Sequence, residues 1–269
     1  MDTTKNILKK YWGFDAFRAS QEDIINDILK GRDVFALLPT GGGKSLCYQL
    51  PGIMMEGVTI VISPLISLMH DQVKQLNEKG IKATSIYSGL SYREIDNKLD
   101  NVRFGDYKFL YVSPERIQTK IFIERFKLMN IALIVVDEAH CISQWGHDFR
   151  PAYKQINSLR EYKPNVSIAA FTATATNQTK ADIIKQLEFK NAATHEAPFI
   201  RENIAYRIFQ SESKISRIIE FCSSVKNSSG IVYCQTRKSV KALTNLLYQE
   251  KLSCGAYHGG MAKDEREKS

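Results

Sequence analysis

The chain has 269 residues, of which 43% are hydrophobic and 25% charged, so it can bury the core of one large domain or of one and a half ordinary ones. Its formal net charge of +8 favours a polyanionic partner. Because no run of about 18 apolar residues occurs and Met1–Lys5 is not an apolar signal segment, we expect no membrane partner and a cytoplasmic location.

Two amphipathic helices are predicted near the N-terminus, over Thr4–Tyr11 and Gln21–Leu29, with Ser20 placed to cap the second. The chain then repeats one pattern, in which a short apolar run is followed by a polar or Gly/Pro signal and a helical segment. Seven such runs are predicted as strands: Val34–Leu38, Val58–Ile62, Phe109–Val112, Leu133–Val136, Ile168–Phe171, Ile231–Tyr233 and Gly255–Tyr257. This alternation favours an α/β fold with a parallel sheet covered by helices on both faces.

The first predicted strand is followed by a loop that contains three consecutive glycines, Thr40-Gly41-Gly42-Gly43-Lys44-Ser45. Glycines let backbone N–H groups turn towards one bound anion, and the helix after the loop would present its positive end to the same anion. Lys44 would supply a charge for the β- and γ-phosphates, and Ser45 a hydroxyl for Mg²⁺. The strict phosphate-loop pattern requires glycine where this chain has Leu38, which we interpret as the buried end of the strand. A glycine-rich surface turn is the alternative.

The strand Leu133–Val136 is followed directly by Asp137-Glu138-Ala139-His140. In a phosphate-cleaving site Asp137 would hold Mg²⁺ through its waters, and Glu138 would orient and deprotonate the attacking water. Acidic residues also end strands because they cap the next helix, but the phosphate loop upstream favours the catalytic interpretation. His140 is a candidate for coupling, with a satisfied core histidine as the alternative. Polar clusters that follow parallel strands share one edge of a sheet, where ligands bind.

These motifs resemble those of superfamily 2 helicases, and Cys141-Ile-Ser-Gln-Trp-Gly-His-Asp-Phe-Arg-Pro-Ala-Tyr153 narrows the resemblance to the RecQ DNA helicases. The resemblance implies a RecA-like P-loop NTPase domain and the start of a second one, with ATP and Mg²⁺ as cofactors. It implies an ATP-dependent 3′-to-5′ helicase that translocates on single-stranded DNA and unwinds partly duplex DNA in recombination and repair. Its location would be the bacterial nucleoid or the nucleus.

The resemblance also assigns site residues. Phe14, Arg18 and Gln21 match the family's adenine site, and Thr172–Thr176 matches the segment that links hydrolysis to strand movement. The implied DNA contacts are Ser63, Pro64, Ser113, Arg116, Trp145, Phe149, Arg150, Thr236, Arg237 and His258. The two aromatic residues of the loop after His140 suit base stacking and its arginine suits a phosphate, whereas core aromatics are the alternative.

The predicted organisation is an ATP-binding domain over residues 1–197, a linker over 198–213 and part of a second motor domain over 214–269. The family's arginine finger and glycine-rich strand find no match, so we expect this chain to bind ATP and to hydrolyse it weakly or not at all. A non-catalytic ATP- and DNA-binding module and an RNA helicase are the competing interpretations. The five cysteines are scattered without a C-x-x-C pair, which predicts neither disulfides nor zinc.

Overall fold

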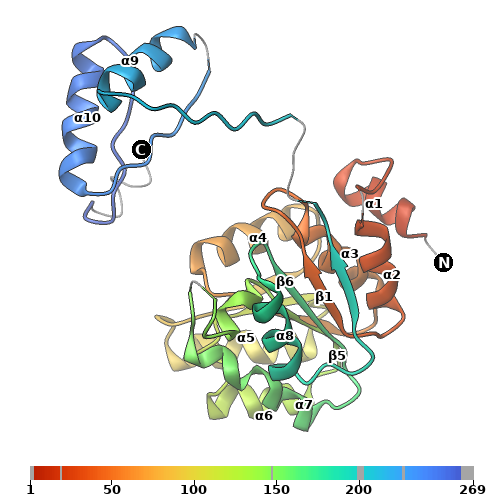
Figure 1. Ribbon diagram of the computed structural model, residues 1–269. Helices are drawn as coiled ribbons and strands as arrows, with labels where there is room; N and C mark the ends of the chain where they lie inside the picture. Colours follow the sequence, from red (N-terminus) through yellow and green to blue (C-terminus); the bar gives the residue numbers. More distant parts are fainter. Residues whose placement is uncertain (1–2, 19, 147, 199–202, 226–227, 262–269) are drawn as a thin grey trace. The chain divides into compact units, whose positions relative to one another are not determined.

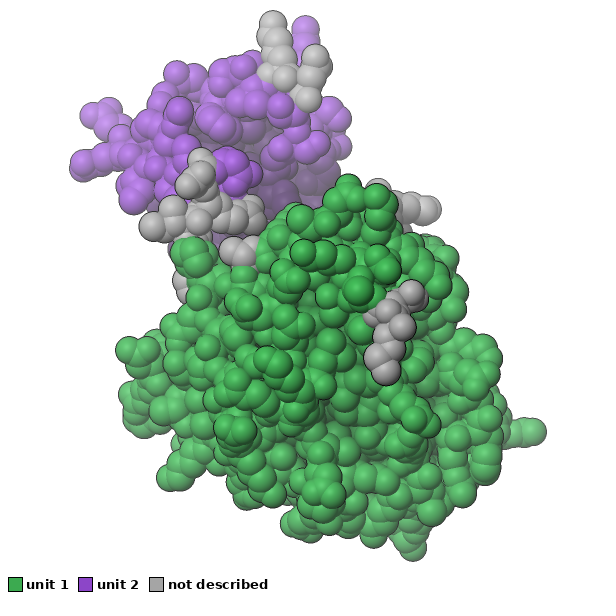
Figure 2. Space-filling view, turned by 90° about the vertical axis from the view of Figure 1, so that its right-hand side faces the viewer, with its two compact units in different colours: residues 1–201 green, residues 202–269 purple. Residues whose placement is uncertain are grey.

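The computed structural model describes residues 3–18, 20–146, 148–198, 203–225 and 228–261. The chain divides into two compact units, Met1–Arg201 (unit 1) and Glu202–Ser269 (unit 2), which Figure 2 colours separately. This division lies within the predicted linker, 198–213, although residues 199–202 of that linker are outside the described part of the chain, as are 226–227 and 262–269 of the predicted second domain. The predicted domain boundaries stay a prediction.

The centre of unit 1, among its described residues, is a seven-stranded sheet in which all neighbouring strands are parallel. The strand order is β3-β4-β2-β5-β6-β1-β7. The strands are β1 Val34–Leu37, β2 Val58–Ile62, β3 Ala83–Ile86, β4 Phe109–Val112, β5 Ile131–Val136, β6 Ile168–Thr172 and β7 Ala193–Glu196. Because the strands are parallel, the segments after them all begin at the same edge, which we call the carboxyl edge.

Helices cover both faces of this sheet (Figure 1). They are α1 Thr4–Trp12, α2 Gln21–Leu29, α3 Lys44–Met54, α4 Ile66–Glu78, α5 Tyr92–Phe104, α6 Lys120–Leu128, α7 Leu159–Tyr162 and α8 Asn177–Gln186, with 3₁₀ segments η1 Ala139–Ile142 and η2 Pro151–Ser158. Alternate residues of β5 enter different cores: Leu133 and Val135 pack with residues of α2, α3 and α4, whereas Ile134 and Val136 pack with residues of α5 and α6. The predicted parallel sheet with two covered faces is therefore confirmed.

The predicted strands of unit 1 agree with the structure to within two residues at each end. The sequence gives no signal for β3 and β7, because each has polar residues in place of an apolar run. Thr84 and Ser85 of β3 are nevertheless buried, and β7 is an edge strand whose residues are only partly covered. Polar residues can occupy a strand when its neighbours supply the burial.

Three local predictions are wrong. Ser20 does not cap α2: its backbone is left-handed, with φ 68°, and its side chain makes no capping bond. The turn before α2 is closed by Gln21 instead, whose side-chain oxygen accepts from the Arg18 N–H at 2.9 Å. In unit 2, Ile231–Tyr233 and Gly255–Tyr257 are not strands. Ile231 and Tyr233 are 81% and 91% exposed, so the described part of unit 2 leaves most of that apolar run uncovered.

Unit 2 contains two helices among its described residues, α9 Lys214–Ser224 and α10 Arg237–Gln249. Both are amphipathic and both are capped by a side chain, Ser213 for α9 and Thr236 for α10. Leu247 is the one apolar side chain that is buried within the described residues of this unit. The two helices of unit 2 are therefore supported by their side-chain caps and amphipathic sequences rather than by a packed core.

Candidate functional site

The glycine-rich loop joins the end of β1 to the start of α3 at the carboxyl edge. Gly41 and Gly43 have φ of 77° and 81°, a left-handed conformation that glycine adopts without strain. α3 begins at Lys44, so the unpaired N–H groups of its first turn face this loop. Leu38 is buried at the end of the strand, as predicted. The loop thus has the conformation and the helix end that an anion site requires.

Residues of the segment before α2 bind the glycine-rich loop directly. The Arg18 guanidinium donates to the Gly41 carbonyl at 2.8 Å, and the Gln21 amide donates to the Gly42 carbonyl at 3.1 Å. A side chain at position 43 would meet Gln21, so the two elements are closely packed. Phe14 is more than half exposed. Of the predicted adenine residues, Arg18 and Gln21 therefore contact the predicted phosphate loop, although most of α2 and all of β1 lie between them and the loop in the sequence.

Asp137 lies at the end of β5 and is buried. It accepts a hydrogen bond from the Ser63 hydroxyl at 3.2 Å, at the end of the neighbouring strand β2. Burial, with the charge of Glu138, raises the pKa of Asp137 to about 6, against the opposing effects of the Glu138 N–H, Lys44 and Ser63. The loop that carries Lys44 follows β1 and Asp137 follows β5, and both strands end at the carboxyl edge with β6 between them. A cation placed there would favour the ionised carboxylate.

Glu138 and His140 form a chain of contacts to β6. The Nδ1 atom of His140 lies 3.3 Å from a Glu138 carboxylate oxygen and 2.9 Å from the Thr172 hydroxyl. Thr172 ends β6 and its hydroxyl donates to the Thr174 carbonyl at 3.1 Å. Both predicted features, the pair of acidic residues and the segment Thr172–Thr176, are therefore connected through His140, which is buried.

The described residues between η1 and η2, 143–146 and 148–150, lie beside the carboxylates and are called the aromatic loop below. Trp145 is 67% exposed and Phe149 is half-buried, with Lys154 Nζ 5.2 Å from its ring centre. Arg150 donates to the Pro64 carbonyl after β2 at 3.2 Å and pairs with Asp148 at 3.1 Å. The exposure of Trp145 agrees with a ligand contact rather than a core position.

The other predicted DNA contacts of unit 1 lie after β2 and β4. The Ser63 hydroxyl is directed at Asp137, so its side chain is engaged inside the site. Ser113 is buried and its hydroxyl has no hydrogen-bond partner among the described residues. Arg116 is half-buried and donates through Nε to the Tyr87 carbonyl at 3.1 Å, after β3. The sheet thus aligns Pro64, Ser113 and Arg116 on one side of the carboxylates.

The predicted contacts Thr236, Arg237 and His258 belong to unit 2. Thr236 caps α10 by accepting from the Ser239 N–H at 3.0 Å, and Arg237 is the first residue of that helix. His258 is half-buried before a turn closed by the Met261 N–H. Within their own unit these residues lie in short loops and at a helix end, and their role as contacts stays a prediction.

Tyr153 ends the aromatic-rich segment, and its sequence pattern predicts no role for it. Its hydroxyl donates to the Asp137 carbonyl at 3.0 Å. Its position in η2, after a polar loop, gives no signal of a contact with β5.

The described residues contain no group of three or more His, Cys, Asp or Glu side chains that could hold a metal ion by themselves. The five cysteines are all free thiols. In the described part of the chain, no helix is long and apolar enough to span a membrane. Because the described residues hold no such metal-ligand group, a divalent ion at Ser45 and Asp137 would need further oxygen ligands from a bound phosphate or from water.

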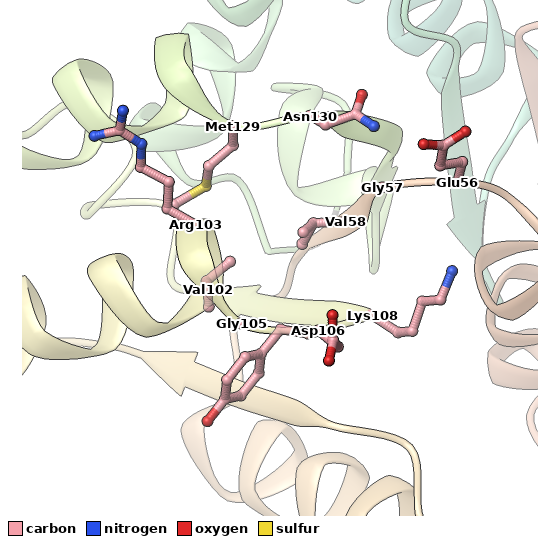
Figure 3. Close-up of a pocket in the computed structure, with 11 residues that line it drawn as sticks. Glu56, Gly57, Val58, Val102, Arg103, Gly105, Asp106, Lys108, Met129 and Asn130 are labelled. Atoms are coloured by element: carbon pink, nitrogen blue, oxygen red, sulfur yellow. The ribbon is translucent and has the colours of Figure 1, made fainter.

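A surface pocket lies at the opposite, amino edge of the sheet, before β2, β4 and β5 (Figure 3). Its walls include Gly57, Lys108 and Asn130, each next to the first residue of one of these strands. Figure 3 shows Glu56 and Lys108 on one side of the view and Met129 next to Arg103 on the other. None of the predicted site residues lines it, so the candidate site is the carboxyl edge rather than this pocket.

Comparisons with known proteins show which family the chain belongs to. The model of the DEAD/DEAH box helicase family matches residues 18–183. The chain is 44% identical over 264 residues to an ATP-dependent DNA helicase RecQ of Bacillus subtilis, covering 97% of this chain and 45% of that protein. It is 41% identical to the corresponding Haemophilus influenzae protein, covering 99% of this chain and 43% of that protein. The chain thus spans about half the length of these curated relatives.

Among solved structures, the DEAD-box helicase Mss116 bound to single-stranded RNA and UDP-BeF is similar in fold, with a TM-score of 0.76 at 19% identity. The comparison covers 100% of this chain and 60% of that one. It shows that the architecture is that of RecA-like helicase domains.

Proposed function

Since the chain belongs to the DEAD/DEAH box helicase family and resembles the RecQ helicases within it, we propose that it is the motor of an ATP-dependent DNA helicase. It would couple ATP hydrolysis to 3′-to-5′ movement on single-stranded DNA and to unwinding of partly duplex DNA in recombination and repair. The observation that supports the proposal is that Lys44, Asp137 and the aromatic loop with its exposed Trp145 all follow strands at the carboxyl edge of one parallel sheet.

In this proposal the glycine-rich loop and Lys44 hold the triphosphate, with Phe14, Arg18 and Gln21 beside the base. Ser45 and Asp137 would hold Mg²⁺, which neutralises charge on the phosphates when it is bound. Glu138 orients the attacking water and accepts its proton. His140 connects that carboxylate to Thr172 through contacts of 3.3 and 2.9 Å, so a change at the phosphate has a short path to β6.

Single-stranded DNA would lie across the carboxyl edge beside the nucleotide. Trp145 and Phe149 offer ring faces to bases, while Arg116 and Arg150 offer cations to phosphates. Stacking and phosphate contacts do not read base identity, which suits a motor that moves along any sequence. Binding should therefore be independent of base order and strongly reduced by salt.

Nucleotide binding is tested by Lys44→Ala, measured by calorimetry with Mg·ATP. We expect this variant to lose binding, because the phosphates lose their nearest positive charge. Lys74→Ala is the matched control, since Lys74 is an exposed residue of α4 that pairs, among the described residues, with Glu78. Equal ATP affinity in Lys44→Ala and the parent chain would show that the loop is misassigned.

DNA binding is tested by the fluorescence anisotropy of a labelled single strand. We expect Trp145→Ala to weaken binding, since alanine substitution of a base-stacking aromatic residue costs about 1–3 kcal/mol. Phe104→Ala is the control, because Phe104 is equally exposed but ends α5 beside the amino-edge pocket. Competition by unlabelled RNA of the same sequence addresses the RNA helicase alternative: RNA that displaces the probe better than DNA would favour it.

Turnover separates a helicase from a non-catalytic ATP- and DNA-binding module. The measurement is ATP hydrolysis with and without saturating single-stranded DNA, with Glu138→Gln as the inactive reference. Because no arginine finger was recognised in the sequence, and such a residue contributes about 10³–10⁵ in rate, we expect slow hydrolysis from this chain alone. Hydrolysis no faster than in Glu138→Gln would support the non-catalytic module.

A further inference from the structure

We propose that Tyr153 is a positioning residue for ATP hydrolysis, whose hydroxyl fixes the peptide group between Asp137 and Glu138 and thereby aims the Glu138 carboxylate. This inference rests on the proposed function, in which Glu138 orients the attacking water. It adds a residue that does not contact nucleotide or DNA and acts through another residue.

The contact itself is direct and buried. The Tyr153 hydroxyl donates to the Asp137 carbonyl at 3.0 Å, and the side chain is 1% exposed. That carbonyl belongs to the peptide bond that joins the two acidic residues. Burial raises the pKa of Tyr153 well above its usual range, so the phenol keeps the proton that it donates. A buried phenol without this acceptor would lose a hydrogen bond without compensation from water.

The peptide group needs such support because of the conformation that follows it. Glu138 has φ of 48°, a left-handed conformation that is uncommon for residues other than glycine, asparagine and aspartate. A residue stays in this conformation when the groups around it hold it there. On the other side, the Asp137 N–H donates to the Ile62 carbonyl at 2.9 Å, so β2 fixes one end of the turn and Tyr153 fixes the next peptide group.

Tyr153 is also tied to the aromatic loop. Its N–H donates to the Arg150 carbonyl at 3.0 Å, and the Arg150 N–H donates to the Cys141 carbonyl at 2.9 Å. Arg150 in turn reaches Pro64 after β2 through its guanidinium. A displacement of this loop by a ligand would therefore move the hydroxyl that holds the carboxylate turn. Tyr153 thus connects the aromatic loop to Glu138 through hydrogen bonds that do not involve the nucleotide.

The test is single-turnover hydrolysis of Mg·ATP by this chain, with ATP affinity measured separately. Tyr153→Phe removes the hydroxyl and keeps the ring in its buried place. We expect its hydrolysis rate constant to fall about tenfold, the effect of one hydrogen bond, at unchanged ATP affinity. In a Glu138→Gln background the same substitution should have no further effect. Tyr111→Phe is the matched control, because Tyr111 is equally buried and its hydroxyl accepts from Gln49.

The possible results separate this inference from the function on which it rests. A parent rate no higher than that of Glu138→Gln would overturn this inference, whereas unchanged ATP affinity in Lys44→Ala would overturn the proposed function on which it rests. If the parent is faster than Glu138→Gln but Tyr153→Phe equals the parent, the inference alone is wrong. It is also wrong if Tyr153→Phe slows hydrolysis equally in the Glu138→Gln background or weakens ATP binding, since a general loss of structure would do both.

Discussion

Replacing Arg160 by methionine should destabilise unit 1 more than any loss of a surface ion pair. Arg160 Nη2 lies 2.6 Å from an Asp33 carboxylate oxygen, and both side chains are almost fully buried. The Asp33 carboxylate also accepts from the Ile168 N–H at 2.8 Å and the Lys190 N–H at 2.6 Å. The pair therefore joins the amino ends of β1 and β6 to the segment before β7. Methionine fills much of the space of arginine but leaves Asp33 buried without its counter-charge.

The expected cost follows from this burial. Two unit charges about 4 Å apart attract by roughly 4 kcal/mol at an effective dielectric constant of about 20. Removal of one partner of a buried ion pair costs about 3–5 kcal/mol in other proteins, which agrees with that value. The Leu187 carbonyl, which accepts from Arg160 Nε at 3.0 Å, also loses its donor. For a unit of this size, about 4 kcal/mol corresponds to a fall in Tm of roughly 8–16 °C.

Urea unfolding followed by tryptophan fluorescence measures this loss in unit 1 alone, because both tryptophans of the chain, Trp12 and Trp145, belong to that unit. Arg125→Met is the control: Arg125 pairs with Asp96 and with Asp100, each at 2.8 Å, but all three side chains are partly exposed, so we expect a loss of about 1 kcal/mol. Adding Asp33→Leu to Arg160→Met removes the buried charge and should restore part of the stability. Equal losses below 1 kcal/mol in both single variants would refute the reasoning.

Three other predictions concern the site and the segment between the units. Because the folded chain raises the pKa of Asp137 from 3.8 to about 6, it binds that proton more tightly than the unfolded chain, and stability is lost as pH rises through this interval. Asp137→Asn should therefore stabilise the metal-free chain by up to about 3 kcal/mol at pH 7.5, with a smaller gain at pH 4.5 in urea unfolding; a less stable variant at pH 7.5 would contradict this. Gly146→Ala should shift the Trp145 emission, since a side chain there meets the His140 carbonyl, whereas Gly230→Ala has open space and should not. Limited proteolysis should cut within the exposed residues 203–213 and leave unit 1 intact, and early cuts inside unit 1 would argue against its compactness.

The sheet of unit 1 was largely predictable from sequence, because its central strands are continuous apolar runs. Val58–Ile62 and Phe109–Val112 have the predicted bounds. The pattern could not show β3, since Thr84 and Ser85 become buried only when α4 and α5 cover them. At Ile231–Tyr233 the apolar pattern predicted a strand that does not form, because this run has no neighbouring strand among the described residues. A run of apolar residues indicates that burial is favourable, but its partner decides whether a strand forms.

The chemistry of the candidate site was predictable for a different reason. Lys44, Asp137 and Glu138 lie in short segments in which residue type and spacing together define a function, so no tertiary contact had to be known. The supporting contacts could not be predicted in this way. The bond from Tyr153 to Asp137 and the pair of Asp33 with Arg160 join residues that are 16 and 127 positions apart. The directions of the Tyr153 hydroxyl and the Arg160 guanidinium depend on the packed fold, and no local sequence pattern indicates them.

The two edges of the sheet offer different freedom to protein engineering. In unit 1 the residues proposed for phosphate and DNA binding follow the strands, whereas Asp33, Arg160 and the pocket of Figure 3 lie at the amino ends. A library for thermostability can therefore be confined to the amino edge, including Glu56 and Asp106 around that pocket, with the opposite edge unchanged. Selection for thermal stability and selection for hydrolysis rate then act on different residues. Substitutions that raise stability and substitutions that raise turnover can be selected separately and then combined in a single variant.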